Sequence, residues 1–300
     1  MLPPHRFYYL HNFQRALDWI GERYADLLDV REQGFLTGFS ALPQQSQALL
    51  VRMLMRRGPW FRADKLVYEE IPDIAAAAGP LLAQGWIDAD AAMALDELFA
   101  LHTKPELLQI LDGFGLQRSL GKREMLQFLQ QNEPEAKPYA AWFPAAPHAA
   151  WRVTISDLAE RLRLMFFGNL HQDWSEFVLA DLGIFLYESV AFDAQSRAFQ
   201  SRADVDGYLA LQQLRQLLVD SGDAVAVLAA IDDGRSEDCW CNPWLERRRA
   251  KLLLRVGQAC ERAQDWALAS EAYAQCNYPG ARHRRIRVLE RQALFGDALA

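Results

Sequence analysis

The sequence predicts a mostly α-helical protein with three parts: a small helical or winged-helix-like module, a helix-turn-helix unit and a series of helical repeats. Two observations support this fold class. Apolar residues recur at steps of three and four along most of the chain, which is typical of amphipathic helices. Glycine and proline separate these runs, whereas alternating strand patterns are scarce. Residues 183–187 fit a short strand or a turn of apolar helix equally well.

Bulk composition fits a globular protein of two or three domains. The chain has 300 residues, of which 51% are hydrophobic and 24% are charged, and its formal net charge is -7. This acidity excludes a uniformly basic coat, so any contact with nucleic acid must come from local patches. No apolar stretch is long enough to predict a membrane span, and the N-terminus lacks the apolar core of a signal peptide. The four cysteines predict reduced thiols rather than disulfides.

Residues 1–95 are predicted to form the N-terminal module. A second helix, at 44–57, should end at Gly58-Pro59 because proline cannot continue the helical hydrogen bonding. A third helix should open at Pro72 and end at Gly85; the wing of a winged-helix module is not visible in the sequence. The first helix is marked by apolar residues at helical spacing: Phe13, Leu17, Ile20, Tyr24, Leu27 and Leu28.

The segment 52–65 concentrates positive charge in an acidic chain. Five cations and one anion surround Trp60 and Phe61 at a Gly-Pro break, a combination that predicts contact with an anionic polymer, most often nucleic acid. An alternative is a solvated cationic face with both aromatics in the core, the arginines pairing with Glu69 and Glu70. The candidate DNA-binding residues here are Arg52, Arg56, Arg57, Arg62 and Lys65 for phosphate, and Trp60 for stacking on an exposed base.

Residues 96–133 resemble a SAP motif, a two-helix DNA-binding unit. The anchors are Lys104, Glu106-Leu107, Gly115-Leu116, Gly121-Lys122 and Leu129, with a shortened step from glycine to lysine. Leu107, Leu111, Met125 and Leu129 should form its small core. A plain helical hairpin is the alternative. The cations predicted to face phosphate are Lys104, Arg118, Lys122 and Arg123, close to the N-terminus of the second helix.

The remaining chain is predicted to be a linker followed by repeats. Four prolines among alanines predict a stiff, exposed linker at 134–150, and helical periodicity returns over 151–300. Residues 250–283 resemble one tetratricopeptide repeat, although an ordinary helical hairpin is an alternative. The last helix, at 282–291, has no polar capping helix after it, which suggests an incomplete repeat region. The repeat resemblance depends on Gly257, Trp266, Ala269 and Tyr273.

The order of these segments is similar to the N-terminal two-thirds of the Fanconi-associated nuclease family, the VRR-type structure-specific DNA nucleases. The matching segments are 8–13, 23–28, 47–53, 58–62 and 68–73, followed by the SAP-like and repeat-like parts. The resemblance implies a C-terminal nuclease domain with two divalent metals, Mg²⁺ or Mn²⁺. It also implies cleavage near 5′ flaps, a role in interstrand crosslink repair and a cytosolic, nucleoid-associated location. The implied partners are branched or flapped duplex DNA and the chain's own nuclease domain; the repeats could add a protein partner.

No catalytic residue or metal ligand is predicted within these 300 residues. Glu135-Ala136-Lys137 is the nearest approach to a nuclease carboxylate-lysine pattern, but it lies in the predicted linker. Phosphate-binding loops and hydrolase motifs are absent from the sequence, and the acidic stretch at 232–238 reads as a solvated loop. Two functions remain: the DNA-binding and DNA-shaping region of a nuclease, or a helical-repeat adaptor that binds protein.

Overall fold

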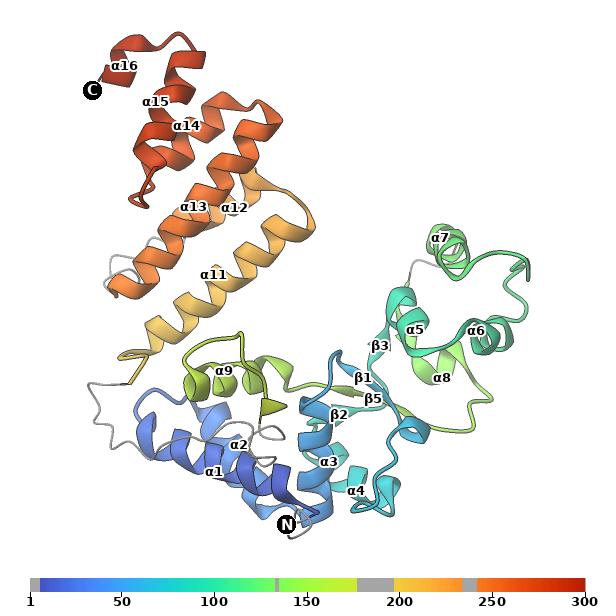
Figure 1. Ribbon diagram of the computed structural model, residues 1–300. Coiled ribbons are helices and arrows are strands. Elements are labelled where there is room, and N and C mark those ends of the chain that lie inside the picture. The colour runs from blue at the N-terminus through green and yellow to red at the C-terminus, as the bar shows by residue number, and fades with distance from the viewer. Residues whose placement is uncertain (1–5, 133–134, 177–196, 234–241, 300) are drawn as a thin grey trace, which may run out of the picture. The chain divides into compact units, whose positions relative to one another are not determined.

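The computed structural model describes residues 6–132, 135–176, 197–233 and 242–299, and the predicted mostly helical fold class is confirmed (Figure 1). The chain divides into two compact units, Met1–Ala191 and Phe192–Ala300. No helix in the described part of the chain is long and apolar enough to cross a membrane. The segment 183–187, a candidate for a short strand or a helix turn, and the acidic and cysteine-bearing stretch at 234–241 lie outside the described residues.

The N-terminal helices of the first unit are α1 (Tyr8–Arg23), α2 (Val30–Ala41), α3 (Gln44–Leu54) and α4 (Ile74–Ala83). The sequence predicts α1, α3 and α4 but gives no separate prediction for α2. That helix begins with a capping box, in which Asp29 and Glu32 each accept a hydrogen bond from the other's backbone N–H. Helix α3 ends three residues before Arg57, and Gly58 then takes a positive φ of 91° to turn the chain.

A three-stranded antiparallel sheet completes this module. Its strands are β1 (Trp60–Arg62), β2 (Ile87–Asp88) and β5 (Ala150–Val153), in the order β1-β5-β2. Phe61 pairs with Trp151, and Ile87 pairs with Val153. The central strand therefore comes from a segment far along the chain, and together with α3 and α4 it makes the winged-helix-like arrangement that the sequence predicts.

The prediction that residues 134–150 form a stiff, exposed linker is wrong. Strand β4 (Lys137–Pro138) pairs with β3 (Ala92–Met93), and α8 (Tyr139–Trp142) follows directly. The Tyr139 and Trp142 side chains are buried, and the Trp142 indole N–H donates to the Met93 carbonyl at 2.9 Å. Burial of these two large aromatics outweighs the extended tendency of the surrounding prolines.

The two-helix unit predicted at 96–133 has three helices: α5 (Leu95–Leu101), α6 (Lys104–Ile110) and α7 (Lys122–Asn132). The break between α5 and α6 falls at Thr103, whose backbone N–H donates to Glu106 in a capping box. The predicted core is confirmed, because Leu107, Leu111, Met125 and Leu129 are all buried in one cluster. Leu98, Phe99 and Trp142 join the same cluster.

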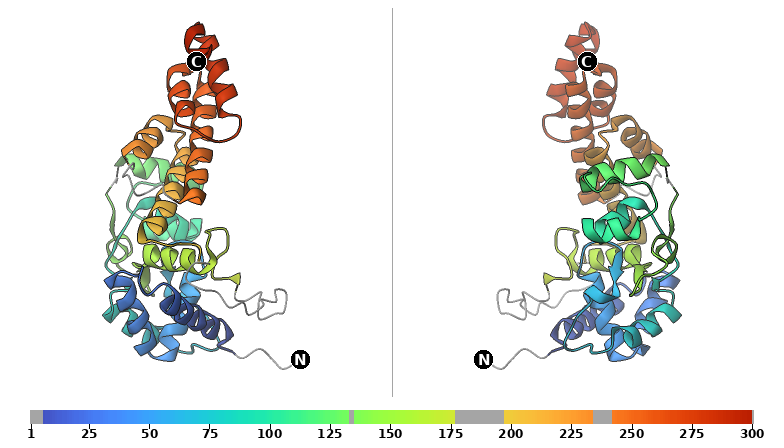
Figure 2. Two further views of the ribbon diagram at one scale, coloured as in Figure 1. Left: turned by 90° about the vertical axis from the view of Figure 1, so that its left-hand side faces the viewer. Right: turned by 90° about the vertical axis from the view of Figure 1, so that its right-hand side faces the viewer.

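The predicted boundary at residue 151 is also wrong. Strand β5 belongs to the first unit, and so does α9 (Ser156–Phe167), which packs against α1. In both views of Figure 2 the yellow-green α9 lies against the blue N-terminal helices. Phe166 contacts Trp19 with ring centroids 5.4 Å apart, and Trp174 contacts Phe13 at 4.9 Å. Apolar periodicity in α9 looks like the start of a repeat, but its partner is the N-terminal module.

The second unit contains α11 (Arg202–Asp220), α12 (Ala224–Asp233), α13 (Pro243–Ala263), α14 (Trp266–Ala274), α15 (Ala281–Arg291) and α16 (Phe295–Leu299). Gly257 of α13 lies directly under the Tyr273 ring of α14, so a larger residue there would clash. This contact joins two of the positions that suggest a tetratricopeptide repeat, although that assignment stays a prediction.

Candidate nucleic-acid interface

The most exposed part of the basic segment is the turn from α3 to β1. Arg56 and Arg57 are both exposed there, directly before Gly58. The Arg56 guanidinium lies 5.4 Å from the centre of the Tyr68 ring. Neither arginine has a carboxylate partner among the described residues. Two adjacent cations without counter-charges are available to an anionic ligand.

Arg52 has a different environment, one turn earlier on α3. Its Nη2 lies 2.6 Å from Glu70 Oε1, and its guanidinium stacks 3.9 Å from the centre of the Tyr9 ring. The Tyr9 hydroxyl donates to the same Glu70 oxygen at 2.8 Å. Arg52 therefore pairs with a carboxylate inside the module, which was the alternative interpretation of this segment, and the phosphate contact predicted for Arg52 is wrong. Glu70 neutralises this cation within the module.

Arg62 and Trp60 are not at the surface, so the DNA contacts predicted for them are wrong. The Trp60 side chain packs in the core cluster around Leu107 and Met125. The Arg62 side chain is only 4% exposed. Alternation along the short strand β1 does not separate an inner from an outer face, because all three of its residues are buried.

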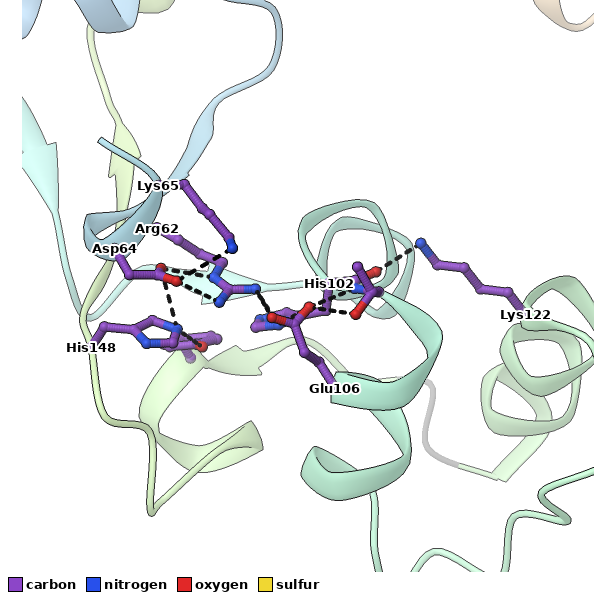
Figure 3. A network of polar contacts seen from close by, with 9 residues as sticks. Arg62, Asp64, Lys65, His102, Glu106, Lys122 and His148 are labelled. Carbon is purple, nitrogen blue, oxygen red and sulfur yellow. Dashed lines mark hydrogen bonds and ion pairs between the residues drawn. The ribbon is translucent and has the colours of Figure 1, made fainter. Parts of the chain in front are cut away.

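Arg62 is the centre of a polar cluster, which we call the Arg62 cluster: Arg62, Asp64, His102 and Glu106 (Figure 3). The Arg62 guanidinium donates to Asp64 at 3.0 and 2.8 Å and to Glu106 at 2.7 Å. It also lies 3.0 Å from His102 Nδ1, which must accept this hydrogen bond because arginine can only donate. One buried cation thus meets two carboxylates and an imidazole.

The Arg62 cluster connects the winged-helix-like module to the SAP-like helices. Arg62 ends β1 and Asp64 lies in the 3-10 helix η1 (Ala63–Lys65), whereas Glu106 lies on α6. Figure 3 shows Lys122 reaching from α7 to His102, where its ammonium donates to the backbone carbonyl at 2.8 Å. These contacts fix β1, α6 and α7 to one another. Lys122 is therefore partly committed to this internal contact.

The environment of the cluster shifts two pKa values downwards. Burial and the nearby Arg62 charge lower the pKa of His102 to about 4. The hydrogen bonds from the Thr103 backbone N–H and from Arg62 lower the pKa of Glu106 to about 2. At neutral pH, His102 is therefore uncharged and Glu106 is ionised.

His102 should make the stability of the first unit depend on pH. Its pKa is lower in the folded chain than in the unfolded chain, so the unfolded state takes up the proton first as pH falls below about 6.5. We expect a loss of about 2 kcal/mol between pH 7 and pH 5 from this group. Urea denaturation at both pH values should show the loss, and it should be much smaller in His102→Gln. Equal losses of stability in the unchanged chain and in His102→Gln would show that His102 is not the group responsible for the pH dependence. Glu106 contributes only at lower pH, as its own folded-state pKa is approached.

The remaining predicted cations lie around the SAP-like helices. Arg118 and Arg123 are exposed and pair with no carboxylate in the described ranges. Lys104 is half-buried, and Lys65 is 64% exposed with a loose ion pair to Asp64 at 3.7 Å. Helix α7 begins at Lys122, with the Gly121 N–H capped by Glu124 at 2.6 Å. Among the SAP-like helices, the exposed positive charge therefore lies just before α7 and in its first turn.

Sequence reasoning misses an exposed cation on the sheet, Arg152, which lies on the central strand β5 between buried Trp151 and Val153. The only signal in the sequence is one charged residue between two apolar residues, which is too short to predict a strand between a proline-rich stretch and a helix. Arg163 and His171 are also missed: they line one cleft together with the turn at 56–59, and this proximity depends on the folded chain.

The described residues do not fit the pair of divalent metals that the family resemblance implies. Among them, no group of three or more His, Cys, Asp or Glu side chains is placed to hold a metal ion. The Arg62 cluster holds only two carboxylates, and Arg62 already occupies both. No catalytic step is therefore assigned to this part of the chain.

Fold and surface together define a helix-turn-helix protein with a SAP unit, whose exposed cations suit a polyanion. Comparisons with known proteins agree. Residues 7–88 match the family model for the FAN1 HTH domain, and residues 92–142 match that for the Fanconi anemia-associated nuclease SAP domain. The chain belongs to the Fanconi-associated nuclease family.

Several relatives support this membership. The Fanconi-associated nuclease 1 homolog of Pseudomonas aeruginosa is 50% identical over 297 residues, which is 99% of this chain and 52% of the relative. The homolog of Oryza sativa subsp. japonica is 29% identical over 241 residues, covering 74% of this chain and 24% of the relative. A crystal structure of paFAN1 bound to DNA with a two-nucleotide 5′ flap and a gap superimposes on this structure with a TM-score of 0.91 and 49% sequence identity. The match covers 99% of this chain and 54% of that chain. This chain spans about half the length of its bacterial relative.

Proposed function

We propose that this chain is the DNA-binding and substrate-shaping region of a structure-specific DNA nuclease. One observation carries the proposal: Arg56 and Arg57 are exposed, adjacent and without carboxylate partners in the described structure, in a chain of net charge -7. Arg118 and Arg123 add a second cationic surface on the SAP unit. Both surfaces lie in the first unit, whose two modules are joined by the Arg62 cluster.

The partner in this proposal is branched or flapped duplex DNA. The matched paFAN1 structures hold 5′ flap DNA with a gap, which supports a similar ligand here. The cations would contact phosphates, which carry no sequence information, so recognition would depend on the shape of the junction. In this proposal, hydrolysis of the phosphodiester with Mg²⁺ or Mn²⁺ belongs to a separate nuclease domain. Interstrand crosslink repair and a nucleoid-associated location remain expectations from the family resemblance.

Two residues of the SAP unit test this proposal without disturbing the core. Arg118→Ala with Arg123→Ala should weaken binding of flapped DNA at low salt, because two exposed phosphate contacts are removed. Stability should change by no more than about 0.5 kcal/mol, since neither side chain forms an ion pair with a residue in the described part of the chain. Fluorescence anisotropy with labelled DNA and thermal denaturation measure the two effects. Unchanged affinity would mean that the SAP unit does not touch DNA.

The competing function is a helical-repeat adaptor that binds protein through the second unit. Salt distinguishes the two functions. Release of counterions predicts that the logarithm of the binding constant falls with the logarithm of salt concentration by about 0.9 for each phosphate contact. A protein interface should respond far less steeply.

A further inference from the structure

A cleft of about 630 Å³ lies beside the turn that carries Arg56 and Arg57. One side is formed by the end of α3 and the turn at 56–59, and the other by α9 and the loop at 170–174. Ser156, Glu160 and Arg163 lie at steps of four and three on α9, so they share the helix face that lines the cleft. All of these elements belong to the first unit.

The arginines at the rim of the cleft are not balanced by the carboxylates that line it. Glu160 is already paired with Arg163 at 3.0 Å, and the Asp173 carboxylate accepts the backbone N–H of Ser175 at 2.8 Å. Neither carboxylate forms an ion pair with Arg56 or Arg57, which therefore remain positive at the rim. The cleft thus offers an anion-binding edge.

The cleft wall combines apolar and polar side chains. Pro59, Phe61, Val153 and Leu170 line it together with the methionines at the end of α3. The volume lies within the range of roughly 300–1,000 Å³ that is usual for small-molecule sites. A bare phosphate would leave these apolar walls unused, whereas a base attached to a phosphate would use both the walls and the rim.

We propose that this cleft holds one unpaired nucleotide of the bound DNA, at a flap or a gap. Its phosphate lies against Arg56 and Arg57, and its base enters between the turn and α9. A paired base enters less readily, because it must lose both its base pair and its stacking, whereas an unpaired base has only its stacking to lose. The inference rests on the proposed function and deepens it by giving the protein a means to select junctions over continuous duplex.

Filling the cleft is the most direct test. Ser156 is exposed on α9, so Ser156→Trp puts a large side chain into the cleft and leaves both arginines in place. The matched control is Gln45→Trp, an exposed position on α3 that does not line the cleft. We expect Ser156→Trp to weaken binding of gapped, flapped DNA by roughly tenfold, as for the loss of one base contact, and to leave blunt duplex binding unchanged. Gln45→Trp should bind both DNAs as the unchanged chain does.

A second measurement does not depend on any variant. The fluorescent base 2-aminopurine, placed at the first unpaired position, should change its emission when the unchanged chain binds. The same base at a paired position should not. No change at any unpaired position would overturn the inference, as would wild-type affinity of Ser156→Trp for flapped DNA or an equal loss on blunt duplex. In each of those results the proposed function still stands, whereas failure of the unchanged chain to bind any DNA at low salt would remove the proposed function itself.

Discussion

Arg62→Leu should destabilise the first unit by about 3 kcal/mol, even though Arg62 is one cation in a strongly basic segment. Leucine keeps the apolar contacts but removes the buried cation that Asp64 and Glu106 share, and it leaves His102 Nδ1 without its donor. Asp64 keeps the looser contact with Lys65 at 3.7 Å and a contact with His148 at 3.5 Å. Both carboxylates are about a third exposed, so water can partly replace the lost contacts, and the loss should lie at the lower end for broken buried pairs. Calorimetry of the unfolding transition measures the effect.

The matched control for this change is Lys65→Ala. Lys65 is a neighbouring cation with an ion pair to the same Asp64, but it is 64% exposed and the distance is 3.7 Å. Its removal should cost less than about 0.5 kcal/mol. If Arg62→Leu were no more destabilising than Lys65→Ala, the Arg62 cluster would not connect the two modules as the structure indicates.

Arg56→Ala with Arg57→Ala should have the opposite profile, with a large effect on DNA binding and little on stability. Both side chains are exposed, and neither forms an ion pair with any residue that the structure describes. Removing two phosphate contacts should reduce the dependence of log affinity on log salt concentration by roughly 1.8, whatever the DNA sequence. Titrations of one flapped DNA at several salt concentrations measure this slope.

Arg52→Ala is the internal comparison on the same helix. Its loss breaks the 2.6 Å ion pair with Glu70 and the contact with the Tyr9 ring, so thermal stability should fall while the salt slope changes little. A reduced slope for Arg52→Ala, with an unchanged slope for the Arg56 and Arg57 double variant, would reverse the assignment of these cations.

Local features of the fold could be predicted from the sequence. Helices α3 and α4 were found because Gly58-Pro59 and Pro72 mark their ends, and these signals act within a few residues. The small core of the SAP unit was found because Leu107 and Leu111 are four residues apart and must share a helix face. Such features depend mainly on residues close together in the sequence, although the observed helices are shorter than predicted by a few residues.

Contacts between distant segments could not be predicted. Strand β5 has four residues, too few to show a period between a proline-rich stretch and a helix. The residues that it pairs with in β1 lie 88 to 92 positions earlier in the chain. The burial of Arg62 depends on Glu106, which lies 44 residues further on. A basic segment therefore reads as one surface in the sequence, whereas the structure separates it into exposed Arg56 and Arg57, paired Arg52 and buried Arg62.

The central claim is that exposed cations of the first unit bind the phosphates of junction DNA regardless of sequence. The most direct test is the salt dependence of binding for two flapped DNAs of unrelated sequence, using the unchanged chain. Four phosphate contacts, from Arg56, Arg57, Arg118 and Arg123, predict a slope of about -3.6 for both DNAs. A slope near zero, or slopes that differ between the two sequences, would contradict the account.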